Sequence, residues 1–255
     1  MNKQFAIVAA LMSASAASSL AWADPDMPGF TVDFSQCTEF AGVGPIDFAR
    51  ASALVPAAFS TLPVGATAGL VVRATGCAGV SVNGGHAVPT NISQIGVEIV
   101  PPDGTGDINN YTLVYLSNNS ELVEQFNKAG VPALFDPDLT YQFTYDSTGK
   151  AGYLYVEADG PGLPGYFIAG NETDPTAPYP GGFRANWWYA GKEGKVKQAS
   201  VFPDIAFGTS SVTFFTSKTS VLGKLIGGNS YSNFTFLPLR GVYSSAHMVV
   251  STSHK

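Results

Sequence analysis

The sequence is poor in charged residues and has only two cysteines and three histidines among its 255 residues. Charged residues make up 13% of the chain, and acidic residues outnumber basic ones, 19 to 13. Because phosphate backbones and anionic lipid surfaces bind to clustered Lys and Arg, we expect neither nucleic acid nor a membrane surface as a partner. Beyond the first 23 residues, the chain has no apolar run of the roughly 20 residues that a membrane-spanning helix needs.

Motifs for metals and cofactors are also missing. His86, His247 and His254 lie far apart and lack the close spacing of zinc ligands. The segment 103–107 (Asp-Gly-Thr-Gly-Asp) lacks the alternating acidic residues of a calcium loop, and Gly beside Asp is typical of a tight turn. The sequence has no nucleophile elbow, phosphate-binding loop or dinucleotide fingerprint. We therefore expect no metal and no cofactor.

The first residues have the pattern of a secretory signal peptide. Lys3 precedes a short apolar stretch, and Ala21-Trp22-Ala23 forms a small-x-small cleavage site. We predict cleavage after Ala23, which leaves residues 24–255 as a single domain of 232 residues with 12 basic and 19 acidic side chains, a formal charge of −7. The protein is then periplasmic or secreted. The sequence does not distinguish these two locations, and it leaves the oligomeric state open.

Export also bears on the two cysteines, Cys37 and Cys77. Disulfides form and persist outside the cytoplasm, so we predict that the two pair. Two separate buried thiols remain the alternative, because a disulfide needs Cα atoms within roughly 7 Å of each other. Nothing resembles a Cys-x-x-Cys motif, so a cystine here would be structural.

Turn-forming residues interrupt short apolar or alternating runs about every ten residues, a spacing typical of an antiparallel, mainly β architecture with a minor α contribution. The expected strands span residues 30–40, 67–75, 92–100, 111–117, 140–146, 151–158, 164–169, 183–190, 196–201, 211–216, 232–238 and 241–250.

Three short helices are expected between the strands. Ser120 can cap a helix that begins at Glu121 and ends at Gly130. A second helix is expected from Asp47 to just before Pro56, since the residue before proline disfavours helical geometry. The third spans about residues 219–226.

One stretch is rich in aromatic residues. Alternation along strands would send about half of them inward, where they fill the core. A cavity lined by such rings and a few polar groups would suit a small, partly apolar ligand. The aromatic residues are Tyr153, Tyr155, Tyr166, Phe167, Phe183, Trp187, Trp188 and Tyr189.

The order of three segments resembles the acetoacetate decarboxylase family. Residues 48–56 (Phe-Ala-Arg-Ala-Ser-Ala-Leu-Val-Pro) are similar to the family's short helix that ends in Val-Pro. Residues 92–101 (Ile-Ser-Gln-Ile-Gly-Val-Glu-Ile-Val-Pro) resemble the strand that lines the family's active site. Residues 113–116 (Leu-Val-Tyr-Leu), the helix from Ser120 and residues 129–137 (Ala-Gly-Val-Pro-Ala-Leu-Phe-Asp-Pro) resemble the part that contains the family's Gly-x-Pro-Lys segment. The resemblance covers residues 45–145 and implies a closed or cone-like antiparallel β barrel with a few short peripheral helices around an internal cavity.

The resemblance implies catalysis by a lysine that forms a Schiff base with a β-keto acid, and here the sequence departs from the family. Ala133 stands where that lysine is expected, and the nearest amine, Lys128, is expected to point towards solvent. Gln94 replaces an acidic residue of the family strand, and an amide cannot serve as a general acid or base. Arg50 matches the neighbourhood of a substrate-carboxylate arginine, although a surface helix residue is the plainer interpretation.

These departures leave three hypotheses. The first is an exported, acetoacetate decarboxylase-like protein without decarboxylase activity that binds a small organic acid or apolar ligand in its cavity, with Arg50, Gln94, Glu98 and Ala133 as the candidate pocket. The second is a lyase-, hydrolase- or isomerase-type enzyme that uses Gln94, Glu98, Arg50 or His86. The third is an extracellular structural or interaction protein. The low charge content offers few titratable groups for catalysis, so we favour ligand binding.

Overall fold

A computed structural model describes residues 29–160 and 162–254 of the chain. The predicted signal peptide, residues 1–23, lies outside this part, so its cleavage remains a prediction. No helix within the described residues is both long and apolar enough to cross a membrane.

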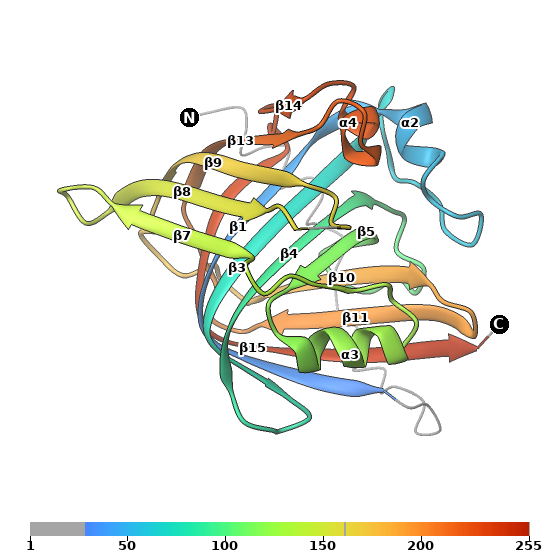
Figure 1. The fold of residues 1–255 in the computed structure, drawn as a ribbon, viewed down its shortest axis with the longest axis horizontal. Helices are drawn as coiled ribbons and strands as arrows, with labels where there is room; N and C mark the ends of the chain where they lie inside the picture. The colour runs from blue at the N-terminus through green and yellow to red at the C-terminus, as the bar shows by residue number, and fades with distance from the viewer. Residues whose placement is uncertain (1–28, 161, 255) are drawn as a thin grey trace.

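Seven strands close into a barrel, because the first and last strands of the series hydrogen-bond to each other (Figure 1). In spatial order they are β1 (Phe30–Asp47), β15 (Leu237–His254), β11 (Gly194–Phe202), β10 (Phe183–Ala190), β5 (Ile108–Ser117), β4 (Val88–Glu98) and β3 (Thr67–Val82).

The barrel is mixed rather than wholly antiparallel as predicted from the sequence. Strands β5 and β10 run parallel, with Asn110 opposite Trp187, whereas the other neighbouring barrel strands are antiparallel. Parallel neighbours need a long crossover connection, and here a helix and three strands of a second sheet lie between β5 and β10 in the sequence. The prediction of a closed, mainly β barrel is confirmed, and only the direction of this one pair was wrong.

A second, five-stranded sheet packs against the outer surface of the barrel, over β1, β3 and β15 (Figure 1). Its spatial order is β14 (Ser230–Tyr231), β13 (Thr209–Thr216), β9 (Tyr166–Thr173), β8 (Ala151–Ala158) and β7 (Thr140–Tyr145). Three two-residue strands extend the barrel sheet: β2 (Pro63–Val64), β6 (Leu134–Phe135) and β12 (Ala206–Phe207).

The long barrel strands therefore bury both faces. Phe40 and Leu70 point outward and pack with Leu154 and Phe214 of the second sheet, and all four are fully buried. Along β1, the alternation of side chains that face the barrel core shifts by one residue at Gln36. The φ of Gln36 is 49°, in the left-handed region. Even-numbered residues of β1 face the barrel core before this position and odd-numbered ones after it, which turns residues 37 and 39 inward.

A buried charge cluster joins the two layers. Arg240 of β15 donates from Nη1 to Glu172 Oε2 at 3.1 Å and from Nε to Asp174 Oδ1 at 2.5 Å. Its guanidinium lies 3.6 Å from the ring centroid of Phe143 on β7. Burial raises the pKa of Glu172 to about 7, although Arg240 opposes this shift. The charges are thus paired within the contact between the layers, as buried charges must be.

The three helices, α2 (Phe48–Ser52), α3 (Ser120–Lys128) and α4 (Val221–Ile226), occur close to the predicted positions. Helix α3 begins one residue earlier than expected, because Asn119 rather than Ser120 is the N-cap and accepts the Leu122 N–H at 3.1 Å. Phe126 of α3 enters the barrel core, where its ring centroid lies 4.3 Å from that of Tyr115.

Most predicted strands are present with shifted ends. Strands β1 and β3 continue to Asp47 and Val82, past the predicted ends at 40 and 75. The strand predicted at 232–238 is not formed, and β15 starts only at Leu237. Phe234 in this segment is buried against Phe40, although the backbone around it is irregular.

The predicted disulfide is confirmed. Cys37 of β1 lies directly opposite Cys77 of β3, their Cα atoms are 4.1 Å apart, and their sulfur atoms are bonded. Both side chains are buried in the barrel core. The bond therefore crosslinks the strand pair that closes the barrel.

We predict that the double variant Cys37→Ala/Cys77→Ala unfolds with a free energy about 4 kcal/mol lower than the wild type, because the crosslink closes a 40-residue segment in the unfolded chain. Urea unfolding of both proteins under oxidising conditions measures the difference. Dithiothreitol should then destabilise only the wild type. A loss below about 1 kcal/mol would contradict the assigned role.

Candidate ligand-binding site in the barrel

An ion pair lies in the barrel core near the disulfide. Arg73 of β3 donates from Nε to Glu39 Oε2 at 2.8 Å, and its Nη2 lies 2.8 Å from the same oxygen. Thr75 Oγ1 and Tyr243 OH also donate to this oxygen, at 3.2 and 3.4 Å. The strand register brings Arg73 and Glu39 together. Glu39 on β1 is paired with Thr75 on β3, and Arg73 is the neighbouring residue of β3 on the same inward face.

Amide side chains extend this centre across the barrel. Gln94 Oε1 accepts a hydrogen bond from Arg73 Nη1 at 3.1 Å, and Gln94 Nε2 donates to Gln198 Oε1 at 3.1 Å. Gln198 Nε2 in turn donates to Thr112 Oγ1 at 3.4 Å. Four strands, β3, β4, β11 and β5, thus hold one continuous polar row, and each bond fixes the orientation of the next amide.

The ion pair keeps Arg73 charged inside the core. Burial lowers the pKa of its guanidinium, but the nearby Glu39 carboxylate and Tyr243 outweigh this effect, so the pKa rises above its ordinary value. Both side chains of the pair are largely buried, with 12% of Arg73 and 6% of Glu39 exposed. Nη1 carries two N–H groups but has one acceptor among the described residues, Gln94.

Glu98 shares the inward face of β4 with Gln94. Strand β4 is regular between these two residues. The register between β4 and β5 does shift here, but the extra residue, Leu113, is on β5. Glu98 is mostly buried, and its carboxylate crosses Gly69 so closely that a Cβ there would collide with it. Burial raises the pKa of Glu98 to about 7. Asn110, directly opposite on β5, is buried, and its Oδ1 has no hydrogen-bond partner among the described residues.

Ala133 also lies in the barrel core. Only 5% of its surface is exposed, and it belongs to the same apolar cluster as Tyr115 and Phe126. Lys128 points away from this core, with 61% of its side chain exposed and a 2.7 Å ion pair to Glu124. No lysine is buried anywhere in the described part of the chain.

Two other candidates from the sequence lie elsewhere. Arg50 is exposed on α2, where its guanidinium contacts Gly227 at the end of α4. His86 is exposed in the turn between β3 and β4. The structure therefore brings Gln94, Glu98 and Ala133 to the barrel interior but places Arg50 and His86 on the surface.

The aromatic stretch does not line one cavity. Trp187 faces the barrel core, Tyr166 is buried between the layers, and Tyr153 and Phe167 are exposed on the second sheet. Within the described residues no group of three or more His, Cys, Asp or Glu side chains is arranged to hold a metal ion.

Comparisons with solved structures match this architecture over nearly its whole length. An acetoacetate decarboxylase-like enzyme from Sphingomonas wittichii RW1 aligns with a TM-score of 0.56 at 9% identity, covering 92% of this chain and 98% of the other. The chain has the acetoacetate decarboxylase-like fold. Acetoacetate decarboxylase from Legionella pneumophila aligns with a TM-score of 0.55 at 8% identity, covering 98% and 94%.

The enduracididine biosynthesis enzyme MppR, solved in complex with pyruvate, has the same fold, with a TM-score of 0.55, 11% identity and coverage of 94% and 98%. No protein-family model matches the sequence, and no curated protein matches it either. The similarity to known proteins is therefore one of fold.

Sequence reasoning missed the centre of this site, Arg73 and Glu39. A signal for both was present, because each is a lone charge within an otherwise apolar or small-residue run of a strand. Charged side chains are almost never fully buried unless they are paired, so two such residues in core strands indicate a partner for each other. Nothing in the sequence shows that the partner is 34 positions away.

We predict that Arg73→Met lowers the free energy of unfolding by about 3–5 kcal/mol, because Glu39 is left buried without its partner. The double variant Arg73→Met/Glu39→Leu has no buried charge at this place and should recover most of the loss. Urea unfolding of the wild type and the variants measures both steps. A double variant as unstable as Arg73→Met would show that pairing is not the cause.

Glu98 gives a prediction for pH. Its pKa is raised in the folded protein, so its contribution to stability is complete below the ordinary value of 4.5 and is lost as the pH rises through about 7. The side chain of the variant Glu98→Gln is neutral at every pH. Between pH 4.5 and 8 the free energy of unfolding of this variant should therefore fall by about 3 kcal/mol less than that of the wild type. Urea unfolding at both pH values measures this difference. The pKa of the buried Glu172 is also raised, but this residue is present in both proteins and does not contribute to the difference. An equal change of unfolding free energy with pH in the two proteins would contradict a raised pKa of Glu98.

Proposed function

We propose that this chain is an exported protein with the acetoacetate decarboxylase-like fold that binds a small organic acid in its barrel without Schiff-base chemistry. The observation that carries the proposal is the composition of the interior. Its buried polar centre consists of Arg73, Glu39 and Gln94, whereas no lysine is buried in the described part of the chain. A Schiff base needs a primary amine, and an arginine does not provide one.

The geometry around Arg73 suits oxygen acceptors. A guanidinium is a planar fork of donors that matches a carboxyl group, and Nη1 keeps an N–H group beyond its bond to Gln94. Because Glu39 already neutralises the cation, the centre favours a compound with a carbonyl or a protonated carboxyl over a highly charged anion. Keto acids have such a carbonyl, and at neutral pH they have only one negative charge, on the carboxylate.

Two further features support the proposal. MppR, which has the same fold, is described as a complex with pyruvate, a small keto acid. The signal-peptide pattern of residues 1–23 and the buried Cys37–Cys77 disulfide both favour an exported protein, since such bonds persist in oxidising compartments.

Glu98 favours a second candidate function, an enzyme on the same scaffold that transfers protons. Its pKa of about 7 lies near neutral pH, where a general acid or base works best. Neither Arg50 nor His86 lies beside it, because both are on the surface. A pH profile of any turnover, with and without Glu98→Gln, distinguishes this enzyme from a binding protein.

We expect no covalent adduct when the purified mature protein is treated with borohydride in the presence of acetoacetate or pyruvate and its intact mass is measured. The same compounds should bind reversibly in calorimetric titrations. Arg73→Lys keeps the charge but loses the fork, and should bind at least about tenfold more weakly, a cost of about 1.4 kcal/mol.

Arg50→Ala is the matched control, since it removes an exposed arginine and should leave binding unchanged. Far-UV circular dichroism verifies that Arg73→Lys is folded. A covalent adduct would contradict the proposal, because it would reveal a reactive lysine. Binding that is equal in Arg73→Lys and the wild type would move the ligand away from this centre.

A further inference from the structure

The outer face of the second sheet carries an unusual set of exposed side chains. Along β8 and β9, even-numbered residues such as Leu154 and Ile168 are buried against the barrel, so odd-numbered residues face solvent. Tyr153 is 49% exposed and Phe167 38% exposed. Exposed aromatic side chains that gather on one face mark interaction sites, because they leave apolar surface in water.

Phe167 belongs to a row of three aromatic rings, Tyr155, Phe167 and Phe215, that crosses three strands. The centroid of Phe167 on β9 lies 4.4 Å from that of Phe215 on β13, with the two rings stacked, and 6.4 Å from that of Tyr155 on β8. The Tyr155 hydroxyl donates to Glu157 Oε2 at 2.8 Å. The row therefore presents aromatic surface to solvent, and this hydrogen bond fixes the orientation of the Tyr155 ring at one end of the row.

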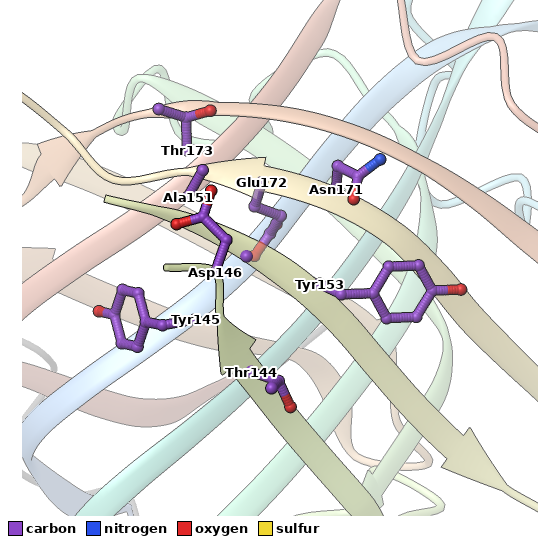
Figure 2. A pocket seen from close by; sticks show the side chains of 9 residues that line it. Thr144, Tyr145, Asp146, Ala151, Tyr153, Asn171, Glu172 and Thr173 are labelled. Carbon is purple, nitrogen blue, oxygen red and sulfur yellow. The ribbon is translucent and has the colours of Figure 1, made fainter. Parts of the chain in front are cut away.

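A hollow of about 400 Å³ lies on the same sheet, at its β7–β8–β9 end (Figure 2). Figure 2 shows the Tyr153 ring at one side and the Asn171 and Thr173 side chains projecting from β9. Ala151, a small side chain on β8, is part of the lining and leaves space between its larger neighbours. The hollow is open to solvent, so a ligand can extend from it along the sheet.

The lining offers polar groups that are not used within the protein. The side chains of Thr144, Tyr153, Asn171 and Thr173 form no hydrogen bond with any other described residue. They supply three hydroxyls and one amide, groups that both donate and accept hydrogen bonds. A ligand with many hydroxyl groups can satisfy them, whereas an apolar ligand cannot.

The charge of this face restricts the ligand further. The strands β7, β8, β9 and β13 contain no lysine or arginine. Carboxylates lie towards its two ends, at Asp146 and Glu157. Lys150, in the β7–β8 turn beside Asp146, is a single cation next to the hollow. Polyanions such as nucleic acids and anionic lipids need clustered cations, so a neutral ligand fits this face best.

We propose that this face, the hollow and the aromatic row together, binds a neutral oligosaccharide. A pyranose ring has an apolar C–H face that packs against aromatic rings and a rim of hydroxyls that pairs with amide, hydroxyl and carboxylate groups. Tyr153 and Phe167 supply the rings, and Asn171 and Asp146 supply polar partners. This site is separate from the barrel interior and does not depend on the ligand bound there.

The test is calorimetric titration of the mature protein with cellohexaose, xylohexaose, maltohexaose and N-acetylchitohexaose. We expect saturable binding of at least one of the four. Tyr153→Ala, Phe167→Ala and Asn171→Ala should each weaken that binding at least about tenfold, while the melting temperature stays close to that of the wild type because the three side chains are exposed.

Phe135→Ala is the matched control, because Phe135 is 46% exposed but lies on β6 of the barrel sheet. It should leave saccharide binding unchanged. The proposal is overturned if none of the four probes binds, or if Phe135→Ala weakens binding as much as Tyr153→Ala. The alternative is that this face binds a second copy of the chain, and sedimentation velocity tests it. A dimer that Tyr153→Ala abolishes would also overturn the proposal.

Discussion

The pairing of β1 with β3 is the constraint on which the rest of the structure depends. It runs without a break in register from Val32 opposite Val82 to Asp47 opposite Thr67 and turns an open sheet into a closed barrel. Closure removes the two exposed edges that an open sheet would present. The Cys37–Cys77 bond lies within this ladder, so the connection that defines the interior is also the one held covalently.

The same ladder determines what the interior contains. Gln36 takes a left-handed conformation, and the shift of the inward-facing residues at that position turns Glu39 into the barrel. Arg73 then meets it from the neighbouring strand, and Gln94 and Gln198 continue the polar row. A buried charge is costly without a partner, so this arrangement is stable only while the barrel remains closed.

The two faces of the barrel wall have different roles. The inner face combines apolar packing with a polar centre, whereas the outer face is apolar and carries the second sheet through a buried arginine and two carboxylates. The second sheet therefore has only its far side left for solvent, and that side carries exposed aromatic rings and unpaired hydroxyls. The two proposed sites, one in the barrel and one on the second sheet, do not compete for space because they lie on opposite sides of two packed layers.

The sequence by itself determined the mainly β architecture, most strand positions, the helices and the pairing of two cysteines, because each rests on local signals or on compartment chemistry. It also placed Gln94, Glu98 and Ala133 in the interior through their resemblance to family segments. Only the tertiary structure decided that β5 and β10 run parallel, that Arg50 lies on the surface, and that Arg73 rather than Arg50 is the interior arginine. These facts depend on strands far apart in the chain meeting in one register, and local periodicity shows which residues share a face but not which strand lies opposite.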